Sequence, residues 1–137
     1  MRRLNMEHNT WDAKVYPGPP CQVWISIPTL PPSLNVWTRK HWRIRHQEVE
    51  EMARNLKLLA LSFNIPRFEK AEVKLTYYFR DKRRRDPDNY VGKFILDGLR
   101  KAGIIAEDNA EVLRLPQPEF KIDPQAPRTE VIIREWT

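Results

Sequence analysis

The sequence contains a single cysteine, Cys21, among its 137 residues. One thiol excludes an internal disulfide and any zinc site built from four cysteines, and it fits a reducing compartment. Long apolar runs are also missing, because no window approaches the roughly 20 apolar residues of a membrane span. Residues 1–14 lack the apolar core of a secretory signal. These absences predict a cytoplasmic protein that does not enter a membrane.

Charge of both signs is abundant, with basic residues in excess. The chain has 24 lysines and arginines against 18 aspartates and glutamates, which gives a formal net charge of +6 and an isoelectric point near 9.7. A basic domain of this size favours a polyanionic partner such as nucleic acid, although charge alone does not establish one. The apolar fraction of 41% argues against disorder.

The periodicity of the apolar residues predicts one α/β (α+β) domain with a mixed sheet of about four strands and two main helices. The strands are expected at residues 22–28, 71–79, 111–122 and 128–136, and the helices at 47–63 and from 86–89 to about 102. The order is β-α-β-α-β-β, and the last two strands should form a hairpin. Residues 1–20 are predicted to be a flexible arm outside a domain of residues 21–137, and residues 29–46 a basic, aromatic loop.

The stretch RDKRRRDPDNYVGK, residues 80–93, sets a cationic run against two aspartates. Its cations are Lys82, Arg83, Arg84 and Arg85, and they precede Asp86 and Asp88. In one interpretation Asp86 caps the following helix and Asp88 lies near the positive end of its dipole. In the other, both carboxylates bind a cation, since Mg²⁺ typically takes one or two carboxylates together with water and substrate phosphate.

Two further features favour the second interpretation. Glu107 and Asp108 add a carboxylate pair after the helix, provided that the chain turns back at Gly103. The cationic run supplies the phosphate contacts that a metal-dependent nuclease needs. Lys93 either pairs with Asp97 on the helix surface or faces a scissile phosphate, where its charge would stabilise the transition state.

These residues form an ordered set: Asp86-x-Asp88-Asn89, then Lys93, then Asp97-x-Leu99, then Glu107-Asp108. Together with the segment IPTLPPSLN at residues 27–35, the set resembles the RusA-like Holliday junction resolvases over residues 22–136. Two positions depart from that family's pattern. Lys93 follows Asn89 by four residues rather than three, and Glu107 stands where the family often has aspartate.

The resemblance implies an endodeoxyribonuclease that resolves four-way DNA junctions in recombination and repair. Asp86, Asp88 and Asp108 match the three catalytic, metal-binding aspartates, and Lys93 matches the catalytic lysine. The implied metal is Mg²⁺, with Mn²⁺ as an alternative, and no organic cofactor is implied. The implied assembly is a homodimer, and a C2 dimer would supply the two symmetric sites that paired cuts require. Many members come from phages or prophages, so the expected location is the cytoplasm of a bacterial or phage-infected cell.

The DNA contacts are expected from two basic stretches. The first is the run Lys82, Arg83, Arg84 and Arg85, with Asn89 as a local or DNA-facing polar group. The second contains Arg39, Lys40, Arg43 and Arg45. Trp37 and Trp42 in that second stretch either stack on unpaired bases or pack in the core.

Other functions stay open at this point. The same metal site could act on flaps or replication forks instead of four-way junctions. Alternatively, the chain is a non-catalytic basic DNA-binding protein whose aspartates serve only as helix caps. A basic interaction module for another protein is a third possibility, and it would show no preference for junctions.

Overall fold

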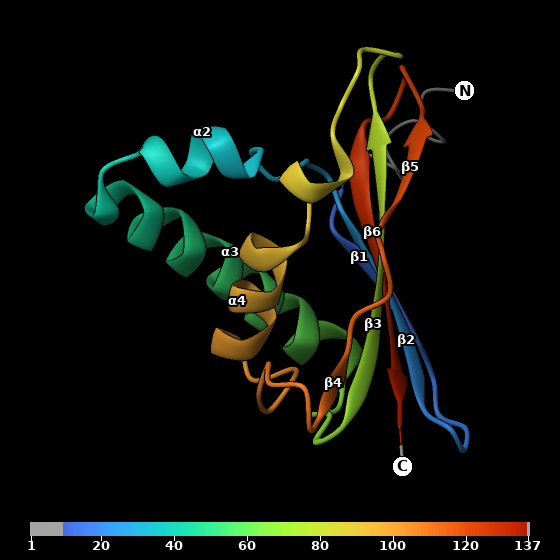
Figure 1. Cartoon of the computed structure of the whole chain (residues 1–137). Coiled ribbons are helices and arrows are strands. Elements are labelled where there is room, and N and C mark those ends of the chain that lie inside the picture. Colours follow the sequence, from blue (N-terminus) through green and yellow to red (C-terminus); the bar gives the residue numbers. More distant parts are fainter. Residues whose placement is uncertain (1–9, 137) are drawn as a thin grey trace.

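The computed structural model describes residues 10–136, which fold into a six-stranded mixed sheet with helices on one side (Figure 1). The strands are β1 (Asp12–Tyr16), β2 (Gln22–Ile27), β3 (Ala71–Phe79), β4 (Leu113–Arg114), β5 (Glu119–Ile122) and β6 (Arg128–Glu135). The helices are α2 (Leu34–Arg39), α3 (Trp42–Phe63) and α4 (Lys93–Lys101), with a short 3₁₀ helix, η1 (Pro87–Asn89). The predicted class, α/β with a mixed sheet, is confirmed.

The sheet has the order β1-β2-β6-β3-β4, and β5 also pairs with β3. The pairs β1–β2, β2–β6 and β6–β3 are antiparallel, whereas β4 and β5 run parallel to β3. At the centre, Val73 lies opposite Ile133 and Leu75 lies opposite Val131. All four of these side chains are fully buried, so the core sits over β3 and β6.

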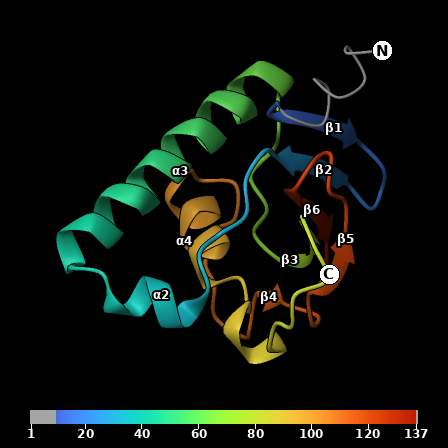
Figure 2. The same ribbon diagram turned by 90° about the horizontal axis from the view of Figure 1, so that it is seen from above.

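The helices cover the apolar face of the sheet, and within residues 10–136 no helix lies on its other face (Figures 1 and 2). Buried and partly buried side chains alternate strictly along strand β3. The buried ones, which face the helices, are Ala71, Val73, Leu75, Tyr77 and Phe79. The helix α3 contributes Val49, Met52, Ala53, Leu56 and Leu59, as its periodicity predicts. A Cβ atom at Gly98 would lie 2.7 Å from Cγ of Met52, so this glycine allows α4 to approach α3 closely.

Residues 29–46, expected as a loop, contain α2 and the beginning of α3. The side chain of Ser33 caps α2, because its Oγ accepts a hydrogen bond from the N–H of Val36 at 3.3 Å. A serine after two prolines is a recognisable helix start, and the prediction overlooked it. The end of α3 agrees with the prediction: Asn64 adopts a left-handed conformation with φ of 54° directly after the helix.

The prediction that residues 1–20 form a flexible arm outside the domain is wrong for residues 12–16. Residues 12–16 form β1 at the edge of the sheet, where Ala13 is buried. The strand pairs with β2 along its whole length, from Asp12 opposite Ser26 to Tyr16 opposite Gln22. The rest of the predicted arm, residues 1–9, lies outside the described residues.

The expected hairpin between the last two strands is also wrong. Both edges of β6 are occupied, one by β2 and the other by β3, so β5 pairs with β3 instead. The single strand expected at residues 111–122 is divided into β4 and β5. Pro116 and Pro118 lie between them, and they offer no N–H to a strand ladder.

The second predicted helix is divided into a short 3₁₀ helix and an α-helix. Residues 87–89 form η1, and α4 starts only at Lys93. Gly92 between them has a φ of 93°, a backbone conformation that residues other than glycine rarely adopt. Gly103, with φ of 82°, follows the helix end at the position predicted for its stop.

Candidate nucleic-acid interface

The cationic run forms an ordered loop directly after β3, and Arg85 organises it. The Arg85 guanidinium donates to the carbonyl oxygens of Asp81 and Arg83 at 2.9 and 2.8 Å, and to Oδ1 of Asp81 at 2.9 Å. Its Cζ lies 4.0 Å from the centroid of the Phe79 ring. The N–H of Arg83 and then the Arg85 guanidinium hold the pKa of Asp81 below its usual value. Arg85, a predicted DNA contact, is therefore engaged within the loop.

The other three cations of the run point outward. Lys82, Arg83 and Arg84 are exposed. Arg83 lies 3.7 Å from a carboxylate oxygen of Asp81, and Nε of Arg84 lies 3.7 Å from Oδ1 of Asp86. Exposed ion pairs of this kind contribute little free energy, on the order of 0–1 kcal/mol. These three side chains can therefore exchange their present contacts for phosphate groups.

Asp86 and Asp88 do not serve as side-chain caps. Asp86 occupies the position before η1, but its carboxylate makes no capping hydrogen bond; only its backbone carbonyl accepts the N–H of Asn89, at 2.9 Å. The Asp88 side chain is exposed and forms no ion pair or hydrogen bond within residues 10–136. It borders an open hollow of about 510 Å³ formed with residues 115–118, and it is the one charged residue in that lining. Neither carboxylate is thus used in holding the local fold.

The two residues that follow Asp88 hold this segment against the rest of the fold. The first is Asn89, whose Oδ1 accepts the N–H of Asn35 in the first turn of α2 at 2.9 Å. Such N–H groups lack partners within the helix. Next comes Tyr90, whose ring packs edge-on against Phe79 and Phe120 at centroid distances of 5.2 and 5.8 Å. Asn89 is thus a local polar group that fastens this segment to α2, one of the two roles predicted for it.

Lys93 is the first residue of α4. Its Nζ lies 3.7 Å from Oδ2 of Asp97 one turn later, so the i, i+4 pair considered from the sequence is present. The Lys93 side chain is largely exposed, and the ion pair is loose. The additional residue between Asn89 and Lys93 falls in the non-helical turn that contains Gly92. Within α4 the spacing from Lys93 to Asp97 is unaffected.

Asp108 lies beside the beginning of β3. Shortly before it in the chain, Ile105 pairs with Phe68, three residues ahead of β3. Shortly after it, Leu113 pairs with Ala71, the first residue of β3. The Asp108 carboxylate is 3.9 Å from Nε of Arg100, in the last turn of α4. The chain does turn back after Gly103, but it turns toward the start of the strand.

Asp86 and Asp88, by contrast, follow the end of β3. That strand has nine residues, which corresponds to about 30 Å at 3.3 Å per residue. The segments before and after α4 accordingly lie at opposite ends of this helix (Figure 1). Within residues 10–136, no three histidine, cysteine, aspartate or glutamate side chains are grouped so that they could hold a metal ion. The described part of one chain therefore does not assemble the three-aspartate set that the resemblance implies.

The second basic stretch lies next to the carboxylate segment, because α2 and η1 are neighbours (Figure 2). Its two tryptophans differ. Trp37 is 6% exposed and packs edge-on against Phe94 at 6.0 Å, so it belongs to the packed interior. Trp42 is 60% exposed, and the His41 ring stacks on it at 5.7 Å. Trp42 is thus the member of the pair that a base could reach, and the His41 ring already stacks on it.

The four cations predicted in this second stretch also differ. Arg39, at the end of α2, and Arg43 are exposed, and the Arg43 guanidinium lies over the Trp42 ring at 5.3 Å. Lys40 is paired with Glu48 at 2.9 Å. Arg45 is partly buried and covers the Trp37 ring at 5.6 Å. Arg39 and Arg43 are therefore the freest of the four to meet a phosphate.

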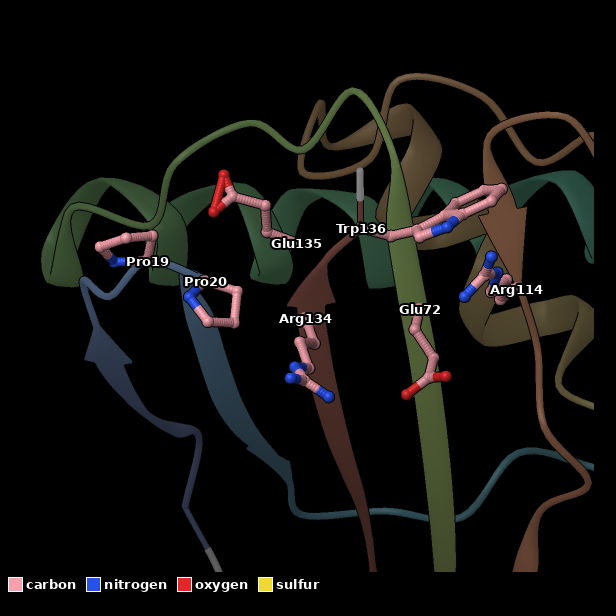
Figure 3. A pocket seen from close by; sticks show the side chains of 7 residues that line it. All are labelled: Pro19, Pro20, Glu72, Arg114, Arg134, Glu135 and Trp136. Carbon is pink, nitrogen blue, oxygen red and sulfur yellow. The ribbon is translucent and has the colours of Figure 1, made fainter.

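Another hollow, of about 540 Å³, opens at the far end of the sheet (Figure 3). Its lining comes from Pro19, Pro20, Glu72, Arg114, Arg134, Glu135 and Trp136. Cζ of Arg114 lies 4.0 Å from the centroid of the Trp136 ring. Glu72 lies opposite Arg114 in β4 and opposite Arg134 in β6. None of these residues is among the predicted site residues, and the hollow borders the start of β3, whereas Asp86 and Asp88 follow its end.

The donor chemistry fits a hard divalent cation in part. Two uncommitted carboxylates, Asp86 and Asp88, are the kind of oxygen ligands that Mg²⁺ takes together with substrate phosphate and water. Asp108 does not join them in this arrangement. The residue that sequence reasoning missed is Asn35, whose backbone N–H fixes Asn89. The two motifs that contain these asparagines were noted separately, but no local signal predicts that they touch.

In comparisons with known proteins, the chain matches no protein-family model and none of the curated proteins. The helices of residues 10–136 include none with the length and apolar character needed to cross a bilayer.

Proposed function

We propose that this protein is a metal-dependent, structure-specific endodeoxyribonuclease that resolves four-way DNA junctions as a homodimer. One observation carries the proposal: Asp86 and Asp88 are exposed and free of capping duties, and they follow a loop whose cations Lys82, Arg83 and Arg84 face outward. The ordered motif that resembles RusA-like resolvases supplies the class of substrate.

Each group of residues has a proposed task. Lys82, Arg83 and Arg84 bind the DNA backbone next to the cut, and Arg39 and Arg43 extend the contact along α2 and α3. Asp86 and Asp88 would hold Mg²⁺ or Mn²⁺, which when bound supplies a water of lowered pKa and polarises the scissile phosphate. Lys93 leaves its loose contact with Asp97 and offsets the negative charge of the transition state.

The decisive experiment is cleavage of a synthetic four-way junction by purified protein with Mg²⁺. We expect paired nicks from the wild type. Asp88→Asn should reduce cleavage by at least about 100-fold, the scale of losing one electrostatic catalytic group. Junction binding should be retained, because Asp88 holds no part of the fold. Efficient cleavage by Asp88→Asn would remove this residue from the site.

Asp108 enters the proposal only through the resemblance, and a separate variant tests it. If Asp108→Asn cleaves normally, the site is confined to Asp86 and Asp88. If it binds the junction but fails to cleave, the assembled enzyme brings Asp108 to the other two carboxylates by an arrangement that a single chain does not adopt. Both results define the ligand set, and the circular dichroism spectrum of the variant controls for folding.

A non-catalytic DNA-binding protein is the second candidate, and the separation of Asp108 from Asp86 and Asp88 favours it. This alternative predicts that junction binding weakens steeply with salt and is indifferent to Mg²⁺. It also predicts no cleavage in a panel of four-way junctions, flaps and forks. The same panel distinguishes a junction resolvase from a nuclease that prefers flaps or forks.

A further inference from the structure

The outer face of α3 carries apolar side chains that no described residue covers. Leu58 and Leu61 are 63% and 69% exposed, and Ile44, near the start of the helix, is 47% exposed. The buried residues of α3 lie on the opposite face, toward the sheet and α4. The outer positions 44, 47, 51, 54, 58 and 61 follow alternating steps of three and four residues, which is the spacing of a helix-pairing seam.

The middle of this seam is charged. Glu51 and Arg54 are both exposed, and neither forms a hydrogen bond or close ion pair within residues 10–136, although the pKa of Glu50, lowered mainly by Lys101, is also lowered by the charge of Arg54. The seam therefore has apolar residues toward its two ends and one acid and one base at its centre. From residue 44 to residue 61 it extends over about 26 Å at 1.5 Å per residue.

We infer that a second copy of this chain binds here, with the two α3 helices packed antiparallel about a two-fold axis. An axis between positions 51 and 54 places Glu51 opposite the partner's Arg54, and Arg54 opposite the partner's Glu51. The same axis places Leu61 opposite the partner's Ile44 and Leu58 opposite the partner's Gln47. A contact of this type is isologous, because the same patch serves both subunits.

The charge pattern favours a second copy over an unrelated helix. One register places both charges opposite partners of the other sign and covers Leu61 and Ile44 at once, and it does so with no residue from outside this sequence. Burial of the exposed leucines then adds a favourable term of about 25 cal/mol per Å² of apolar surface removed from water. The inference rests on the proposed homodimer in that it names the surface of that assembly, but its test needs no DNA.

The experiment measures the dimer dissociation constant of the full chain by sedimentation equilibrium. Glu51→Arg and Arg54→Glu each place like charges opposite one another, and each should weaken the dimer at least about tenfold. The double variant carrying both changes restores opposite charges and should return the constant to near the wild-type value. Lys14→Glu, at an exposed position of β1 next to the buried Ala13, makes the same change of charge away from the seam; it is the matched control and should leave the constant unchanged.

The possible outcomes distinguish failure of the proposed dimer surface from failure of the proposed activity. A wild-type chain that remains monomeric at its highest soluble concentration overturns the inference, as does a dimer insensitive to both single charge changes. Leu58→Glu is a second, independent variant that should also yield monomers, with circular dichroism showing that the exposed substitution leaves the fold intact. Dimerisation through α3 without any junction cleavage would refute the proposed activity alone, whereas cleavage by a dimer insensitive to these variants would refute the surface alone.

Discussion

Arg84 and Arg85 are adjacent in the sequence, yet the structure gives them different roles. The Arg84 side chain is 93% exposed, whereas that of Arg85 is 15% exposed and makes three hydrogen bonds within its own loop. From the sequence, both belong to one cationic run, and nothing in their type distinguishes them. The difference comes from the carbonyl oxygens of Asp81 and Arg83 and from the Phe79 ring, which contact the Arg85 guanidinium and not that of Arg84.

Asn89 allows a direct test of its hydrogen bond to α2. Asn89→Asp keeps an oxygen that can accept the N–H of Asn35, and a carboxylate is favourable at a helix N-terminus. We expect its free energy of unfolding to stay within about 0.5 kcal/mol of wild type, while Asn89→Leu loses about 1–2 kcal/mol. Urea denaturation measures both. Equal losses for the two variants would contradict the assigned hydrogen bond.

The elements with regular apolar spacing could be predicted from the sequence, and the elements that depend on a distant partner could not. The alternation over residues 71–79 and the helical stripe of residues 49–59 identify β3 and the buried face of α3, because each pattern is complete within the segment. Strand β1 has only Ala13 buried, so its existence depends on pairing with β2. The hairpin was predicted from proximity in sequence, and β6 instead has β2 and β3 on its two edges.

The turn between η1 and α4 sets where Lys93 emerges, and Gly92 makes it possible. A Cβ atom there would lie 2.4 Å from Cδ1 of the buried Leu75, in addition to the cost of a φ of 93°. We expect Gly92→Ala to lower the free energy of unfolding by about 2–4 kcal/mol, from overpacking together with backbone strain. Gly103→Ala is the matched control, because φ is 82° there but nothing lies within 4 Å. It should cost only the backbone share, about 1–2 kcal/mol.

The two variants are compared by thermal or urea unfolding of the same chain. Equal destabilisation would mean that Leu75 moves aside without cost and that the packing argument fails. If Gly92→Ala is folded at room temperature, its junction-cleavage rate also reports whether the aim of Lys93 depends on this turn.

For the molecule as a whole, the candidate site shows which contacts can be predicted from adjacency in the sequence and which cannot. The proximity of Asp86 and Asp88 to the cationic loop follows from adjacency in the chain, and it could be predicted. The position of Asp108 depends on the direction the chain takes after α4. Ile105 pairs with Phe68, three residues ahead of β3, and the nine residues of that strand then separate Asp108 from the other carboxylates. Spacing along a sequence contains no information on that direction.

The net charge of +6 gives the last prediction, because overall charge and local contact can be distinguished. Replacing Lys82, Arg83 and Arg84 by glutamine removes three outward cations beside the proposed site. Replacing Lys14, Lys57 and Lys70 by glutamine removes the same charge from exposed positions elsewhere.

Each phosphate contact contributes about 0.9 to the slope of log affinity against log salt concentration. The first variant should therefore lose about 2–3 from the magnitude of that slope for junction DNA, and the second less than about 1. Fluorescence anisotropy over a range of salt concentrations measures both slopes. Identical slopes for the two variants would show that the protein attracts DNA through its net charge and that the loop after β3 is not where the backbone binds.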